Sequence, residues 1–165
     1  MNAGAYEHEF GEFITAVKIL KDNKAKWVKN FSFSYRNSSF KNSNMIILAV
    51  RLKLKKELNA DEIIKNQYFY LNKRKESQPY GENSAGSVFK RIITDKEIFY
   101  PAKIIDNLGL KGVKIGGAEI SNKHSGFIIN SENAKAKDVL KLIGLIKKKV
   151  KKETGKVLEE EIVIV

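Results

Sequence analysis

Apolar and polar residues alternate along several short stretches of the chain, and this alternation predicts strands. The first two predicted strands cover residues 13–20 and 25–33, and they would pair across a turn at 21–24. Residues 1–6 contain a glycine and small residues without a period, so we expect a loop there. The remaining predicted strands cover residues 45–54, 86–90, 113–115, 118–120, 127–129 and 157–165.

Two segments before the last third of the chain have the signals of helices. Asn59 can cap a helix over residues 60–75. A second helix is predicted over 100–108, because Pro101 suits the first turn and Gly109 can end the last turn.

The longest predicted helix covers residues 134–154, with Asn133 as its cap and Gly155 as its stop. Strands and helices are mixed without a regular βα alternation, so we expect an α+β fold. The apolar stripe of the long helix consists of Val139, Leu142, Ile143, Ile146 and Val150.

The net charge adds a preference for anionic partners. The 165 residues carry 31 Lys and Arg against 19 Asp and Glu, a net charge of +12, which favours phosphorylated ligands. Basic residues are not interleaved with aromatic ones in the way typical of RNA-recognition modules, so we expect no nucleic-acid partner. Arginine is rare beside lysine, and its planar fork suits carboxylates and phosphates. The arginines are Arg36, Arg51, Arg74 and Arg91.

Several classes of chemistry are disfavoured by composition. The chain has no cysteine, so disulfides, thiolate nucleophiles and cysteine-ligated metals are excluded. Its two histidines, His8 and His124, are far apart in the sequence, and we expect no metal site. Neither a bilayer-spanning apolar run nor a secretory signal pattern is present, so we expect a cytoplasmic protein without a membrane partner.

Three side chains could together stabilise and protonate a carbanion. Ser87 follows Gly86 at a predicted strand, Arg36 follows Tyr35 at a strand end, and Glu161 precedes a final apolar run. Each has an ordinary structural explanation when taken alone: a turn serine, a surface arginine over an aromatic ring, and a solvated acidic face. Only their combination supplies a proton donor, a permanent cation and a carboxylate.

Further short motifs occur in order along the chain, from Met1 to Tyr6 through Tyr35 to Lys41 and Ser84 to Arg91 as far as Gly155 to Glu161. Their order resembles that of the UDP-N-acetylenolpyruvoylglucosamine reductase (MurB) family of flavoenzymes. The connection at 77–84 and the Lys90-Arg91 pair resemble the shorter of its two types, which lacks an extra tyrosine-bearing loop. The matching motifs are Met1 to Tyr6, Tyr35 to Lys41, Gln78-Pro79, Ser84 to Arg91, Leu108 to Gly112, Ile115 to Ala118, His124 to Asn130 and Gly155 to Glu161.

The resemblance implies a reaction and roles for the three side chains. In this family NADPH reduces bound FAD, and the flavin then reduces UDP-N-acetylglucosamine enolpyruvate to UDP-N-acetylmuramate in peptidoglycan precursor synthesis. By motif, Ser87 is the general acid, and Arg36 with Glu161 stabilises the enolate-like intermediate. A fixed cation and a short hydrogen bond would suffice for these roles.

The resemblance also implies binding residues. The predicted contacts to the substrate are Tyr35, Arg74, Lys90, Arg91 and His124. The predicted contacts to the flavin are Asn2, Ala3, Gly4, Ala5, Tyr6 and Arg36.

The family pattern implies a division of the chain into three parts. Residues 1–76 resemble the last part of the FAD-binding domain, 77–154 the substrate-binding domain, and 155–165 a final strand that returns to the FAD-binding domain. The family's N-terminal lobe, with its Gly-Ser-Asn segment for the FAD diphosphate, has no counterpart here. We therefore expect an N-terminally truncated reductase that binds FAD weakly and self-associates through uncovered strand faces. The alternative is a non-catalytic fragment that binds UDP-sugars.

Overall fold

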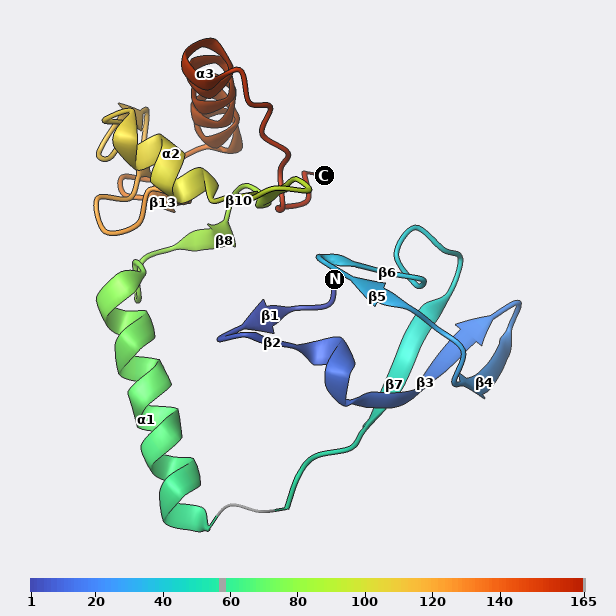
Figure 1. The fold of residues 1–165 in the computed structure, drawn as a ribbon. Coiled ribbons are helices and arrows are strands. Elements are labelled where there is room, and N and C mark those ends of the chain that lie inside the picture. The colour runs from blue at the N-terminus through green and yellow to red at the C-terminus, as the bar shows by residue number, and fades with distance from the viewer. Residues whose placement is uncertain (57–58, 165) are drawn as a thin grey trace. The chain divides into compact units, whose positions relative to one another are not determined.

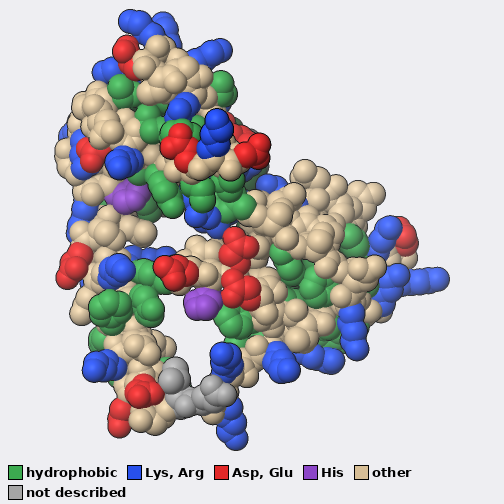
Figure 2. All heavy atoms as spheres, viewed as in Figure 1, with side chains coloured by type: hydrophobic (Ala, Val, Ile, Leu, Met, Phe, Trp, Pro, Cys, Tyr) green, Lys and Arg blue, Asp and Glu red, His purple; other side chains and the backbone are tan. Residues whose placement is uncertain are grey.

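The computed structural model describes residues 1–56 and 59–164, and it divides the chain into two compact units, Met1–Ala60 and Asp61–Val165. Figure 1 shows helices together with antiparallel strands, which confirms the α+β prediction. None of the helices in the described part of the chain combines the length and apolarity needed to cross a membrane. On the face shown in Figure 2, Lys and Arg side chains are spread over several elements.

The first unit is built around a three-stranded antiparallel sheet in the order β4-β3-β7. Its strands are β3 (Ile14–Lys21), β4 (Lys24–Val28) and β7 (Ile46–Leu52), close to the predicted segments. Val17 lies opposite Val28 on one side and Val50 on the other. Val17, Ile19 and Phe40 form the buried core of this unit.

Short elements that the sequence did not predict surround this sheet. The expected loop at 1–6 contains β1 (Gly4–Ala5), which pairs with β2 (His8–Glu9). A 3₁₀ turn, η1 (Phe10–Phe13), leads into β3, and β5 (Phe33–Ser34) pairs with β6 (Asn37–Ser38). Two-residue strands are too short for a hydrophobic period to reveal them.

In the second unit, α3 (Ala136–Thr154) packs against a four-stranded antiparallel sheet in the order β11-β12-β13-β8, and α2 (Pro101–Asn107) packs against α3. The sheet strands are β8 (Ser84–Ser87), β11 (Lys114–Ile115), β12 (Ala118–Ile120) and β13 (Phe127–Asn130). The helices are α1 (Ala60–Ser77), α2 (Pro101–Asn107) and α3 (Ala136–Thr154), and a small separate hairpin joins β9 (Ile92–Ile93) to β10 (Ile98–Phe99).

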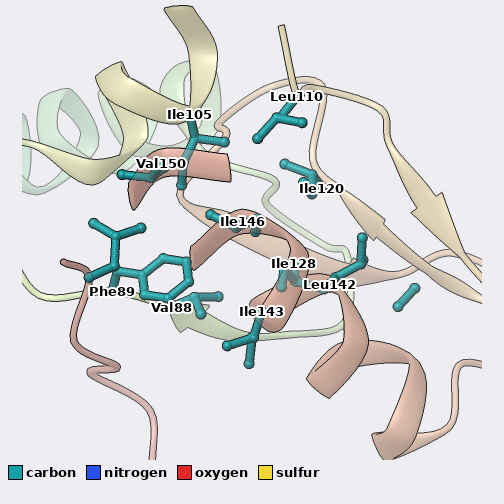
Figure 3. Packing of buried hydrophobic residues seen from close by; sticks show 12 residues of the cluster. Val88, Phe89, Ile105, Leu110, Ile120, Ile128, Leu142, Ile143, Ile146 and Val150 are labelled. Carbon is teal, nitrogen blue, oxygen red and sulfur yellow. The ribbon is translucent and has the colours of Figure 1, made fainter. Parts of the chain in front are cut away.

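The core of the second unit collects side chains from α2, α3 and the sheet (Figure 3). Four of the five predicted stripe residues of α3 are buried in the unit, and Val139 packs against the cluster while partly buried. The buried members of the cluster include Val88, Phe89, Ile105, Leu110, Ile120, Ile128, Leu142, Ile143, Ile146, Val150 and Leu158.

The ends of α3 differ in how well the sequence predicted them. Gly155 ends the helix as expected, with φ of 69° and its N–H donating to the Lys151 carbonyl. Asn133 is not the cap: the helix begins at Ala136, and the Asp138 carboxylate accepts a hydrogen bond from the Lys135 N–H over 3.0 Å. A carboxylate in the first turn satisfies an otherwise unpaired N–H there.

The predicted final strand over 157–165 is wrong for the residues described. Residues 157–164 contain only an isolated antiparallel bridge, between Glu160 and Phe89. Leu158 is buried in the core of the second unit, whereas Val163 and Ile164 are exposed. An apolar composition favours a strand only where a neighbouring strand supplies hydrogen bonds. The return of this segment to a flavin domain stays a prediction, as does the three-part division of the chain.

Candidate functional site

Ser87 is the last residue of β8, and it is exposed directly before two buried residues of the second unit. It is opposite Phe127 of β13, and the next residue, Val88, donates its N–H to the Gly126 carbonyl over 2.9 Å. Gly86 has φ of +84°, a left-handed conformation that other residues rarely adopt. Val88 and Phe89 are each only 3% exposed, so the hydroxyl of Ser87 projects from a backbone anchored in the core.

The C-terminal segment brings Glu161 to the residue that directly follows Ser87. The Glu161 N–H donates to the Val88 carbonyl over 2.7 Å, and the Lys90 N–H donates to the Glu159 carbonyl over 2.9 Å. These two hydrogen bonds flank the Phe89–Glu160 bridge. The predicted proton donor and the predicted carboxylate therefore come from two backbone segments in direct contact, although they are far apart in the sequence.

Lysines neutralise the two carboxylates that precede Glu161. The Lys147 Nζ lies 2.8 and 3.0 Å from the two oxygens of Glu160. This hydrogen bond holds the pKa of Glu160 below its ordinary value, against the opposing effect of partial burial. Lys90 pairs with Glu159, so the ammonium predicted to contact substrate already has one carboxylate beside it.

Arg36 lies in the first unit, next to the residues predicted to contact the flavin. Its guanidinium carbon is 5.0 Å from the centre of the Tyr35 ring, a cation–π contact. An ideal Cβ placed on Gly4 would lie 3.5 Å from Nη1 of Arg36, so the N-terminal segment and this guanidinium are in contact. The backbone of Arg36 is left-handed, with φ of +52°.

The side chain of Asn2 is used to hold this N-terminal segment. Its amide nitrogen lies 2.6 Å from a carboxylate oxygen of Glu9 and 3.3 Å from the Ser34 carbonyl. Its oxygen accepts the Gly11 N–H over 2.8 Å, and the residue is 5% exposed. Asn2 therefore joins the N-terminal segment to Glu9, Gly11 and Ser34, and the exposed residues of this segment are Met1, Ala3, Ala5 and Tyr6.

His124 lines a cavity of about 180 Å³ in the second unit, together with Asp106, Lys111 and Ser125. Burial lowers the pKa of His124, and the charge of Lys111 lowers it further. Nδ1 lies 3.1 Å from the Gly126 N–H, which places the proton of the neutral ring on Nε2. His124 thus presents a neutral hydrogen-bond donor rather than a cation near pH 7.

The other predicted substrate contacts have less definite surroundings. Arg91 is half-buried directly after Lys90, and Arg74 is exposed in the last turn of α1. Within residues 1–56 and 59–164, no group of three His, Asp or Glu side chains could hold a metal ion.

Sequence reasoning did not identify two features of this region. The first is the Lys147–Glu160 pair, because a lysine-rich helix and an acidic run each resemble a solvated face. The second is a cavity of about 330 Å³ lined in part by Ser84, Ala85, Val88 and Ile162. No pattern in the sequence indicates that the C-terminal segment lies against residues 88–90.

Comparisons with known proteins agree with the motif order. Residues 78–165 match the family model described as "UDP-N-acetylenolpyruvoylglucosamine reductase, C-terminal domain". The enzyme of that name from Thermotoga petrophila is 50% identical over 99% of this chain and 57% of its own length. The corresponding enzyme from Fervidobacterium nodosum is 49% identical, again over 99% of this chain and 53% of its own length.

A solved structure gives the same result at the level of the fold. The crystal structure of the reductase (MurB) from Thermus caldophilus matches 98% of this chain and 56% of its own, with a TM-score of 0.79 and 35% identity. The chain thus spans somewhat more than half the length of the relatives that it matches. On the motif order, the family model and this fold, the chain belongs to the UDP-N-acetylenolpyruvoylglucosamine reductase family.

Proposed function

We propose that this chain carries the substrate-protonating half of a UDP-N-acetylenolpyruvoylglucosamine reductase, and that it acts on UDP-N-acetylglucosamine enolpyruvate with FAD and NADPH. The observation that carries the proposal is the hydrogen bond from Glu161 to Val88, which joins the segment of the predicted carboxylate to the strand of the predicted acid. Family membership supplies the reaction, and this contact supports the roles of the two residues.

Ser87 would donate its hydroxyl proton to the carbanion carbon of the reduced enolpyruvyl group. A serine hydroxyl is a weak acid, but a strongly basic carbanion needs only a short, well-aligned hydrogen bond. The anchored backbone that follows Ser87 supports this alignment, because Val88 and Phe89 cannot move without disturbing the core. Solvent or a neighbouring acid would then restore the proton to Ser87.

Arg36 and Glu161 would stabilise the charge that develops on the enolpyruvyl carboxylate. A guanidinium keeps its charge at any working pH, and its planar fork suits a carboxylate. Glu161 would hydrogen-bond to the enol form of the intermediate.

The first unit has features that fit a flavin. The contact between Gly4 and Arg36 and the hydrogen bonds of Asn2 hold residues 1–6 as one cluster, so Asn2, Ala3, Gly4, Ala5, Tyr6 and Arg36 would hold FAD there. When bound, FAD would carry a hydride equivalent from NADPH to the enolpyruvyl double bond.

The remaining predicted contacts would bind the nucleotide-sugar. Lys90 and Arg91 offer charge to a diphosphate, and the neutral ring of His124 can donate from Nε2 to an uncharged oxygen. Tyr35 and Arg74 complete the proposed set.

A second function is favoured by the difference in burial between the two units. The first unit ends in an exposed apolar strand, β7, whereas the second unit has a complete core, so the chain could bind UDP-sugars without holding FAD. Calorimetry with UDP-N-acetylglucosamine in the absence of flavin tests this alternative directly. A flavin-fluorescence titration shows in parallel whether FAD binds.

The experiment for the proposed function follows the oxidation of NADPH by the chain in the presence of FAD and the enolpyruvyl substrate. Ser87→Ala should lower kcat by about 10²- to 10⁴-fold, the usual contribution of a general acid. Ser84→Ala, in the same strand, is the matched control and should retain turnover. An unmodified chain that binds FAD and substrate without turnover, or a Ser87→Ala variant with full kcat, contradicts the proposal.

A further inference from the structure

The C-terminal segment is attached to the second unit by a short series of contacts that ends near Glu161. The Lys156 Nζ lies 3.7 Å from the centre of the Phe99 ring, and Leu158 is 1% exposed in the core. Ile162, directly after Glu161, packs against the core while partly buried, and Val163 beyond it is 77% exposed. The position of Glu161 therefore depends in part on what holds the residues immediately before it.

Two ion pairs hold those residues, and they differ in their exposure to water. In the Lys90–Glu159 pair the glutamate side chain is 73% exposed, so solvent weakens the attraction. In the Lys147–Glu160 pair the side chains are 37% and 24% exposed, and the ammonium contacts both carboxylate oxygens. The second pair is the better shielded and the better aligned of the two.

The Lys147–Glu160 pair acts directly on the backbone next to Glu161. Glu160 forms the bridge with Phe89, and the following N–H, that of Glu161, donates to Val88. Without the ammonium of Lys147, the half-buried carboxylate of Glu160 would lose its partner and turn toward water. That movement would pull on the hydrogen bond that holds Glu161 beside the strand of Ser87.

We propose that Lys147 is a positioning residue, which fixes Glu161 beside the strand of Ser87 through its ion pair with Glu160. The proposal rests on the proposed role of Glu161 in the reaction, although the attachment itself does not. Lys147 lies on α3 and contacts Glu160, so it would act through the backbone and not on the substrate.

Amide hydrogen exchange measured on this chain tests the attachment without any turnover. Lys147→Met should speed exchange of the Glu161 N–H by about tenfold, while the N–H of Val150 within α3 keeps its rate. Lys147→Arg should restore protection, because it keeps the charge. The double variant Lys147→Glu with Glu160→Lys, which reverses the two charges, should restore the protection in part. Lys148→Met, an exposed lysine of the same helix, should leave the Glu161 rate unchanged.

Two outcomes overturn the proposal. In the first, Glu161 keeps its exchange rate in Lys147→Met. In the second, Val150 and Glu161 accelerate equally, which would mean that the pair only stabilises the whole unit. In the turnover assay, Lys147→Met should lower kcat with little change in KM, and a change in KM alone also contradicts positioning. If the unmodified chain gives no turnover, the proposed function fails, whereas the exchange rates still decide the attachment.

Discussion

The two units bury their apolar residues to very different extents, although their sequences give equally clear patterns. In the second unit α3 buries Leu142, Ile143, Ile146 and Val150 in one core. In the first unit every residue of β7 is exposed, and Ile46 is 61% exposed. A hydrophobic period thus predicts the type of an element, but not whether this chain supplies the surface that covers it.

The same contrast separates the helices of the second unit. Helix α3 has buried residues along its length, whereas α1 has no buried residue. Exposed Tyr68 and Phe69 on α1, like β7, are apolar groups that the described part of the chain leaves accessible to solvent. Large-to-small substitutions should therefore destabilise the buried elements far more than the exposed ones.

The largest effect is expected from shortening a core residue of α3. Leu142→Ala should lower the free energy of unfolding of the second unit by about 3 kcal/mol, because the side chain is fully buried and leaves a cavity. Leu48→Ala in β7 is the matched control and should change stability by less than about 1 kcal/mol.

Urea unfolding can assign each change to a unit. Trp27 is the only tryptophan in the sequence and lies in β4 of the first unit, so its fluorescence reports on that unit. Circular dichroism at helical wavelengths reports mainly on the second. A Leu142→Ala variant that shifts neither transition would show that the α3 core is less tightly packed than described.

A smaller effect is expected at the glycines of α3. Gly155 has φ of 69°, so Gly155→Ala should destabilise the helix end by about 1 kcal/mol. Gly144 lies in the middle of the helix, and a Cβ added there would meet open space. Gly144→Ala should therefore stabilise the second unit by up to about 1 kcal/mol. Thermal unfolding of both variants checks the opposite signs, and equal signs would contradict the assigned helix end.

Glu160 should make a still smaller contribution, which appears in how the stability of the second unit depends on pH. Its pKa is lower in the folded chain than the ordinary 4.5, because Lys147 hydrogen-bonds to the carboxylate. The ion pair thus stabilises the fold above the unfolded pKa, and the stabilisation is lost as the pH falls through the folded pKa. Glu159 and Lys90 are the neighbouring charges on the attached segments.

Lys147→Met should therefore reduce the dependence of unfolding midpoint on pH in the acidic range. The Lys148→Met variant should keep the slope of the unmodified chain. If the unfolding midpoint depended equally on pH in the unmodified chain, Lys147→Met and Lys148→Met, the ion pair would have no effect on stability.

The smallest effect on folding is expected for a charge placed on β7, where it should instead change association. Leu48→Lys leaves the core of the first unit untouched, so the unfolding midpoint measured by Trp27 fluorescence should barely change. If copies of the chain associate through this strand, the variant should shift sedimentation toward the monomer. Thr15→Lys on β3 is an exposed control that should leave sedimentation unchanged.

The sequence predicted the long helices and the apolar face of α3 well, because their residues satisfy a period over several turns. It failed where one long-range contact decides the local structure. Residues 157–164 read as a strand from their composition, but they form only a bridge to Phe89. The predicted cap of α3 at Asn133 was wrong. The helix begins later, where the Asp138 carboxylate accepts a hydrogen bond from the N–H of Lys135.

The candidate site shows the same limit. Ser87, Glu161 and Arg36 were identified through an ordered set of motifs, and the structure brings the first two onto touching segments. Lys147 was not identified, because its partner Glu160 lies on the C-terminal segment. No local pattern in the sequence indicates that this segment lies beside α3. The predicted role of Asn2 at the flavin stays a prediction, although its side chain is engaged within the protein.

The hydrogen bond between Glu161 and Val88 also has a consequence during synthesis of the chain. Contacts between residues far apart in the sequence form late, after both partners have left the ribosome. Ser87 emerges long before Glu161, so the nascent second unit passes through a stage in which Ser87 is present without Glu161. Any chain released before Glu161 is added would retain most of its core but lack this hydrogen bond.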